Sequence, residues 1–168
     1  MSYKDSHSWY PLYTRSRHEK FVETELLEKG IEAFTPKVTY RRKWSDRIKY
    51  IKEPLFKSYC FAKFSLFNKT EILSQAGIVS VVHFQSKYVP VPEKIIQSLR
   101  IITETNYQAN PCPYLNKGDY VYIKKGPLKG VEGFILEKRN NNTSVVISVD
   151  ALASAIKCVV GIDCVEFS

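Results

Sequence analysis

The chain has 168 residues, of which 44% are hydrophobic, and a formal net charge of +8. This length allows one ordinary domain or two small ones, and the apolar content is too high for general disorder. No apolar run approaches the ~20 residues needed to span a bilayer, and the N-terminus lacks the apolar core of a signal peptide. We therefore expect a cytoplasmic protein that does not bind membranes.

The four cysteines form no Cys-x-x-Cys pair and have no histidine nearby in the sequence. A zinc site or a thioredoxin-like redox centre would need such spacing. The three histidines are scattered and lack a neighbouring nucleophile or carboxylate constellation. The sequence therefore predicts no metal, no cofactor and no active site.

The positive charge is concentrated in one segment. Residues 37–57 contain eight lysines and arginines but only two acidic residues, Asp46 and Glu53. A localised basic patch favours a polyanionic neighbour, and the common polyanions of a cytosol are nucleic acids. A solvated loop is the simpler alternative for such a charge run.

Strand and helix signals alternate through the first two thirds of the chain. The expected strands cover residues 9–14, 31–44, 53–64, 78–84 and 88–89. The expected helices cover residues 18–29, 68–75 and 92–102. Pro11 predicts a sheet edge or a bulge in the first strand, because proline cannot donate a ladder hydrogen bond. Trp44-Ser45-Asp46-Arg47 is typical of the tip of a long hairpin, with basic residues on both sides.

The chain changes character after a stretch around Asn110-Pro111-Cys112-Pro113, which has the composition of a linker. Five short β runs follow, and their spacing predicts a small barrel. They cover residues 120–123, 131–136, 145–149, 156–160 and 165–167. Between the first two lies Gly126-Pro-Leu-Lys-Gly130-Val-Glu-Gly133, whose glycines predict a tight turn. It is no phosphate-binding P-loop, because Ser or Thr does not follow a Gly-Lys pair there.

Residues 119–133 closely resemble the KOW motif, which occurs in ribosomal proteins and in NusG-type transcription elongation factors. Further upstream, Trp9-Tyr10-x-x-Tyr13, Trp44-Ser45-Asp46-Arg47 and Glu53-Pro54-Leu55-Phe56-x-x-Tyr59-x-Phe61 resemble the NusG N-terminal domain. The hairpin tip and the Gly-Pro-Leu-Lys-Gly turn are similar to the specialised UpxY-like and RfaH-like antiterminators of polysaccharide operons. The chain departs from the family at Lys57-Ser58, where Pro-Gly or Pro-Asn is usual, and at Ala76, where RfaH-like proteins have a basic residue.

The resemblance implies an α+β fold: a NusG N-terminal antiparallel sheet flanked by helices (residues 1–106), a linker (107–114) and a five-stranded KOW barrel (115–168). It implies a non-enzymatic, monomeric antitermination factor that binds the clamp coiled coil of RNA polymerase and suppresses pausing. Further implied partners are the non-template DNA strand and, for the barrel, a ribosomal protein or a termination factor. We expect the barrel to keep its β fold, because its runs are rich in β-branched residues.

Strand parity places Tyr59 and Phe61 on one face of their strand and Cys60, Ala62 and Phe64 on the other. The same alternation places Phe56 on the face of Cys60, Ala62 and Phe64, which we expect to point toward the core. Core packing could account for all of them, but we expect Tyr59 and Phe61 to be exposed, because exposed aromatic patches usually mark partner sites. The expected polymerase-binding residues are Tyr13, Phe56, Tyr59 and Phe61.

The expected nucleic-acid-binding residues combine the first strand-to-helix junction, one later residue and the hairpin. They are Arg15, Arg17, His18, Lys20, Gln75, Arg41, Arg42, Lys43 and Arg47. The residues expected to shape the KOW turn are Gly126, Leu128, Gly130 and Gly133. Two other functions stay open: a general housekeeping NusG-type factor, and a ribosome- or RNA-binding KOW protein, which the N-terminal motifs disfavour.

Overall fold

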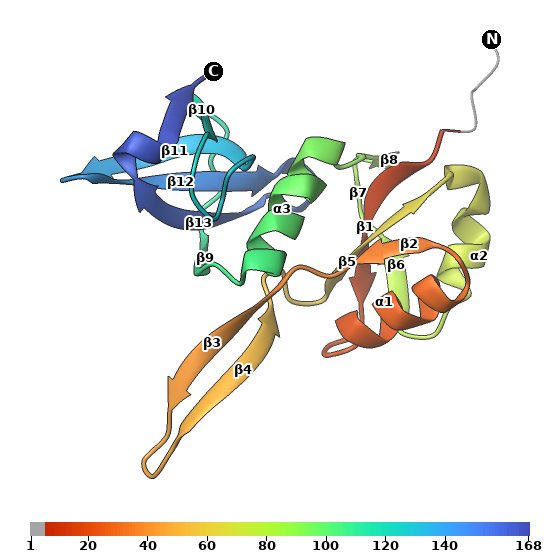
Figure 1. Ribbon diagram of the computed structural model, residues 1–168. Helices are drawn as coiled ribbons and strands as arrows, with labels where there is room; N and C mark the ends of the chain where they lie inside the picture. The colour runs from red at the N-terminus through yellow and green to blue at the C-terminus, as the bar shows by residue number, and fades with distance from the viewer. Residues whose placement is uncertain (1–5) are drawn as a thin grey trace. The chain divides into compact units, whose positions relative to one another are not determined.

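The computed structural model describes residues 6–168 and divides the chain into two compact units (Figure 1). The N-terminal unit runs up to Thr35 and resumes over Phe56–Glu93. The C-terminal unit contains Pro36–Leu55 and Lys94–Ser168. The long hairpin and the last helix therefore group with the C-terminal strands, whereas the sequence placed them with the first domain.

The N-terminal unit is built on an antiparallel sheet of four strands in the order β2-β5-β1-β6. These strands are β1 (Ser8–Thr14), β2 (Glu32–Phe34), β5 (Tyr59–Phe64) and β6 (Ile78–Val81). The unit also contains helices α1 (Glu19–Glu28) and α2 (Lys69–Leu73), the 3-10 turn η1 (Leu66–Asn68), and the small hairpin β7 (His83–Phe84) and β8 (Lys87–Tyr88).

Alternation along the two central strands creates the core of this unit. Tyr10 of β1 pairs with Ala62 of β5, and Leu12 pairs with Cys60, so these side chains share one face. They form a buried cluster with Val22 of α1 and other apolar residues of the unit. The predicted inward parity of Cys60, Ala62 and Phe64 is confirmed, since all three are buried in this cluster.

Pro11 lies in an interior strand, because β1 pairs with both β5 and β6. The ladder with β6 begins at Leu12, and the Pro11 carbonyl accepts the last bond, from the Val82 amide, at 2.9 Å. A proline is tolerated where a ladder ends, because no neighbour needs its missing N–H group. A bulge does follow, between Tyr13 and Thr14.

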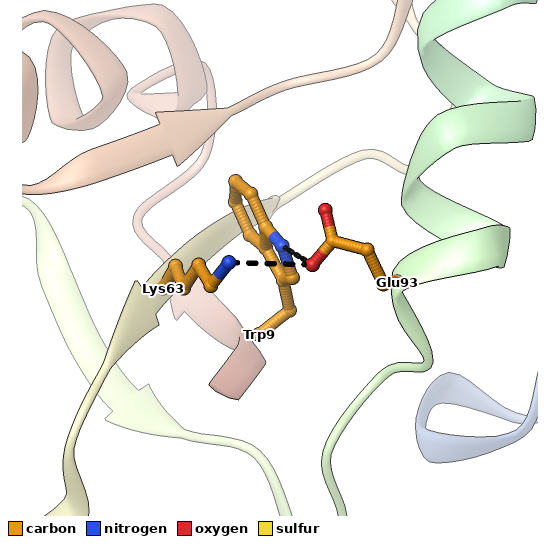
Figure 2. A network of polar contacts seen from close by, with 3 residues as sticks. All are labelled: Trp9, Lys63 and Glu93. Carbon is orange, nitrogen blue, oxygen red and sulfur yellow. Dashed lines mark hydrogen bonds and ion pairs between the residues drawn. The ribbon is translucent and has the colours of Figure 1, made fainter. Parts of the chain in front are cut away.

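A polar contact holds the end of the N-terminal unit against its sheet (Figure 2). The buried Trp9 indole donates a hydrogen bond to Glu93 Oε2 (2.9 Å), and Lys63 Nζ lies 3.4 Å from the same oxygen. The Val91 amide also donates to the Trp9 carbonyl at 2.8 Å. These contacts fix Glu93, the last residue of this unit, beside β1 and β5. Helix α3 (Glu93–Thr105) starts at this residue and continues into the other unit.

The C-terminal unit contains a six-stranded sheet in the order β14-β10-β11-β12-β13-β9. Its strands are β9 (Ala109–Cys112), β10 (Tyr120–Ile123), β11 (Glu132–Arg139), β12 (Asn142–Val149), β13 (Ser154–Gly161) and β14 (Val165–Phe167). Two 3-10 turns, η2 (Asp150–Leu152) and η3 (Ile162–Cys164), connect them. The unit also holds α3 and the two-stranded hairpin β3 (Lys37–Lys43) and β4 (Ile48–Pro54).

The sixth strand lies within residues 107–114, which the sequence predicts to be a linker. Ala109–Cys112 pairs antiparallel with β13, with Asn110 opposite Lys157. The prolines that suggested a linker fit this position, because β9 is the edge of the sheet and an edge strand tolerates a missing N–H group. The five strands expected from the sequence form the rest of the sheet.

The glycine-rich turn has the tight geometry that its sequence predicts. Gly126 and Gly130 adopt left-handed backbone conformations, with φ of 88° and 97°. The Gly130 amide donates to the Ile123 carbonyl at 2.8 Å, and the Val131 amide donates to the Leu128 carbonyl at 3.0 Å. Leu128 is buried, so the turn is closed by hydrogen bonds and anchored by one apolar side chain.

The cysteines of the C-terminal unit are expected to differ sharply in reactivity. Burial raises the pKa of the Cys158 thiol from its ordinary value of 9.0 to about 12, whereas Cys164 is only half-buried. Thiolate is the reactive form, so N-ethylmaleimide at pH 8 should leave the buried Cys158 unmodified. It should label Cys164, which is more accessible, as peptide mass spectrometry can show. Rapid labelling of Cys158 in the native protein would contradict this burial.

The raised pKa of Cys158 also makes the stability of the folded state depend on pH. The stabilisation is fully present below about pH 9, where the thiol is protonated in both the folded and the unfolded chain. It is lost as the pH rises toward 12, because the thiol of the unfolded chain ionises first.

Candidate functional site

Two of the four residues expected to bind polymerase form an aromatic pair at the end of the N-terminal sheet. Tyr13 and Tyr59 lie directly opposite each other on β1 and β5, with ring centroids 5.7 Å apart. Tyr13 is 43% exposed and Tyr59 is half-buried. This Tyr13–Tyr59 pair is a partly exposed aromatic surface next to the loop that enters α1.

The expectation that Phe61 is exposed is wrong. Its side chain is fully buried, and Phe56, also buried, meets it edge to face with centroids 6.0 Å apart. Both faces of β5 are therefore covered by other parts of the protein at Phe61. Strand parity shows only which face a side chain is on, not whether that face is buried. Phe61 and Phe56 are therefore buried residues and do not belong to an open surface.

Phe56 does not follow the alternation of side chains along β5, because a turn separates it from this strand. Ser58 has a positive φ of 66°, and the Tyr59 amide donates back to the Phe56 carbonyl at 3.3 Å. Ser58 is the position at which the resembled family usually carries Gly or Asn, the residue types that most readily adopt this conformation. The strand thus begins only at Tyr59, and Phe56 turns toward the Phe61 side.

The buried carboxylate of Glu19 holds this turn in place. Glu19 Oε1 accepts a hydrogen bond from the Ser58 amide at 2.7 Å, and the Thr14 amide donates to the Ser58 carbonyl at 2.8 Å. The turn is thereby tied both to the first residue of α1 and to the end of β1. These bonds position Tyr59 opposite Tyr13.

Glu19→Ala is expected to destabilise the N-terminal unit by about 2 kcal/mol, because it removes a charge-assisted bond and leaves the Ser58 amide without its acceptor. Urea unfolding of the full chain measures this loss. Glu28→Ala, which alters an exposed residue at the end of the same helix, should change stability by less than about 0.5 kcal/mol. Equal effects of the two substitutions would show that the Glu19 bond does not hold the turn.

The structure brings the cations of the β1–α1 loop beside a later segment of the chain. The Arg15 amide donates to the Gly77 carbonyl at 2.9 Å, and a Cβ added at Gly77 would lie 3.4 Å from the His18 ring. Arg15, Arg17 and Lys20 are exposed. We call the surface formed by Arg15, Arg17, His18 and Lys20 the basic corner.

Gln75, also expected to bind nucleic acid, lies next to Gly77 but is engaged within the protein. Its Oε1 accepts a hydrogen bond from Lys29 Nζ, and its Nε2 donates to the Glu71 carbonyl at 3.0 Å. Lys29 is not among the residues predicted from the sequence, because it follows the C-terminal end of α1, away from the basic corner. The fold brings this additional cation to the Gln75 segment.

The four basic hairpin residues do not form one surface. Arg41, Arg42 and Lys43 belong to β3, so their side chains alternate between its two faces, and Arg47 lies in the tip. Arg42 lies 3.6 Å from Glu53 Oε2 in an ion pair. Arg41 and Lys43 project from the other face.

The hairpin is tied to the start of β9 and to the residues just before it, within the same unit. The Thr39 amide donates to Asn106 Oδ1 at 2.8 Å, and the Tyr40 hydroxyl donates to the Ala109 carbonyl at 2.8 Å. Burial raises the pKa of the Tyr40 hydroxyl above its ordinary value. Figure 1 shows the hairpin as a long two-stranded arm.

Within residues 6–168 no group of three or more His, Cys, Asp or Glu side chains is placed to hold a metal ion. In the same part of the chain, no helix is long and apolar enough to cross a membrane. Two small α+β units that carry separate basic surfaces are typical of proteins that bind other macromolecules.

Comparison with known proteins identifies the family. The NusG family model, described as transcription termination factor nusG, matches residues 7–100, more than half of the chain. The chain belongs to the NusG family, whose members are non-enzymatic transcription factors. No protein among the curated sequences matches it.

A solved structure agrees with this assignment at the level of the fold. NusG of Thermotoga maritima, solved in a study of its domain interaction, is 20% identical, with a TM-score of 0.50 over 95% of this chain and 96% of that one. The MjSpt4:Spt5 complex is 12% identical over 95% of both chains, with a TM-score of 0.34. The α+β architecture with antiparallel sheets, predicted from the sequence, is confirmed.

Proposed function

We propose that this protein is a transcription antitermination and elongation factor that binds RNA polymerase through its N-terminal unit. The observation that carries the proposal is the Tyr13–Tyr59 pair, a partly exposed aromatic surface on a chain of the NusG family. Aromatic side chains dominate protein interfaces, because they bury a large area at little conformational cost. The clamp coiled coil of the polymerase is the proposed partner.

The basic corner is the proposed contact with the non-template DNA strand. It begins directly where β1 ends, so Arg15 is two residues from Tyr13. A protein docked through Tyr13 would therefore present these cations beside its polymerase contact. The basic hairpin is a second proposed nucleic-acid contact.

The C-terminal sheet is the proposed recruiting module, with a ribosomal protein or a termination factor as its partner. The closed geometry of the Gly126–Gly133 turn supports a KOW-type sheet. The tip Arg-Lys-Trp-Ser-Asp-Arg and the Gly-Pro-Leu-Lys-Gly turn favour a specialised factor of a polysaccharide operon over a housekeeping one.

Pull-down of RNA polymerase, paired with transcription in vitro of the leader next to the gene, tests the proposal. The protein should retain polymerase and increase read-through on that leader but not on unrelated templates. Arg15→Glu with Arg17→Glu should abolish the leader-specific effect and leave polymerase retention intact. Equal read-through on all templates would indicate a housekeeping factor, and failure to retain polymerase would refute the proposal.

A further inference from the structure

The register of the hairpin β3–β4 sorts its side chains into two faces. Residues directly opposite each other in an antiparallel pair project to the same side, and successive pairs alternate. One face carries the pairs Val38–Glu53, Tyr40–Ile51 and Arg42–Lys49, and we call it the anchored face. The other carries Thr39–Lys52, Arg41–Tyr50 and Lys43–Ile48, and we call it the open face.

The anchored face is occupied by contacts within the protein. Val38 is fully buried, the Tyr40 hydroxyl binds the Ala109 carbonyl, and Arg42 is paired with Glu53. Lys49 Nζ lies over the Trp44 ring, 5.3 Å from its centroid. The single carboxylate of the two strands, Glu53, lies on this face and partly neutralises it.

The open face contains cations without a carboxylate. Arg41, Lys43 and Lys52 have no ion-pair partner among residues 6–168. Between them lie two exposed apolar side chains, Tyr50 at 71% and Ile48 at 45%. Same-face residues of a strand recur about every 7 Å, a spacing similar to that of neighbouring phosphates in a stretched nucleic-acid strand.

We propose that the open face of the hairpin binds single-stranded nucleic acid, with its cations on the phosphates and Tyr50 stacked on a base. This inference rests on the proposed nucleic-acid contact of the hairpin and specifies its ligand. Phosphate contacts need only cations, so duplex binding would leave the exposed aromatic ring unused. Stacking needs a base face, which only an unpaired strand offers, and basic grooves with interleaved aromatic rings are the usual single-strand sites.

Two double variants of the full chain, matched in charge, separate the faces. Arg41→Gln with Lys43→Gln removes two cations from the open face, and Arg42→Gln with Lys49→Gln removes two from the anchored face. Fluorescence anisotropy with a labelled 12-nucleotide single strand should show about tenfold weaker binding for the open-face variant and less than about a twofold change for the other. The open-face variant should also lower the slope of log affinity against log salt by about 1.4.

Substitutions of Tyr50 test the stacking. Tyr50→Ser should weaken single-strand binding about tenfold, and Tyr50→Trp should preserve it. Neither change should alter the binding of a duplex of the same length. Parallel measurements with DNA and RNA strands identify which of them the face prefers.

Several outcomes would overturn the inference. Equal losses from the two double variants would show that only total charge matters, and a neutral Tyr50→Ser would exclude stacking. A wild-type protein that binds the duplex more tightly than the single strand would assign the face to duplex DNA. Loss of polymerase retention in the open-face variant, with oligonucleotide binding unchanged, would assign it to an acidic protein surface. Polymerase retention by the wild type is measured separately, so failure of the proposed function is distinguishable from failure of this inference.

Discussion

Gly133→Ala is expected to disrupt the C-terminal sheet. A Cβ added at Gly133 would lie 2.3 Å from the Val146 carbonyl oxygen and 3.0 Å from Val145 Cγ1. The obstacle is the backbone of the neighbouring strand, which cannot move aside as a flexible side chain can. The β11–β12 ladder would have to shift, and we expect a loss of stability of about 3 kcal/mol or more.

Gly126→Ala is the matched control, because it makes the same chemical change in the same turn. No atom lies within 4 Å of an added Cβ at Gly126, and only its φ of 88° opposes alanine. Left-handed backbone costs a non-glycine residue about 1–2 kcal/mol, so the control should lose less stability than Gly133→Ala. Urea unfolding followed through the amide signals of residues 120–167 measures both. A cost below about 1 kcal/mol at Gly133 would show that the two strands are farther apart than the structure places them.

The sequence predicted most strands of the C-terminal sheet, because β-branched runs and glycine turns are local signals. It did not predict β9, since Asn110-Pro111-Cys112-Pro113 has the composition of a loop. The pairing of this segment with β13 joins residues more than 40 positions apart, and no local pattern encodes it. Edge strands are the elements for which composition is least informative, because they tolerate proline.

The sequence was sufficient to predict which aromatic residues lie at the candidate site, but not which of them are exposed. Parity correctly separated Cys60, Ala62 and Phe64 from Tyr59 and Phe61. Whether the second face of β5 is covered is a property of tertiary packing, so the burial of Phe61 could not be deduced from the strand alone. The turn at Ser58 was likewise hidden, because serine carries no strong signal for positive φ.

The hairpin shows the same division between local and nonlocal information. Its basic character and its tip at residues 44–47 follow from the sequence. The distinction between its faces depends on the register and on the bond between Tyr40 and Ala109, which are 69 residues apart. The predicted set therefore combined Arg41 and Lys43 with Arg42, although Arg42 projects from the opposite face.

Phe61→Ser and Tyr59→Ser are expected to fail in different ways, although the two residues are neighbours on one strand face. Phe61 is fully buried, so its truncation should cost about 4 kcal/mol and unfold much of the N-terminal unit. Tyr59 is half-buried and pairs with the exposed Tyr13 ring, so Tyr59→Ser should leave the chain folded. It should nevertheless weaken polymerase binding about thirtyfold, the effect typical of an interface hot spot.

Circular dichroism and urea unfolding give the stability of each variant, and a quantitative polymerase pull-down gives its binding. Tyr13→Ser should behave like Tyr59→Ser, because the two rings form one surface. Tyr50→Ser on the hairpin is the control for loss of an exposed tyrosine elsewhere, and it should retain polymerase. A folded Phe61→Ser protein that no longer binds polymerase would place Phe61 in the interface. Normal binding by both Tyr13→Ser and Tyr59→Ser would move the docking surface away from this end of the sheet, because the pair is the observation on which the proposed contact depends.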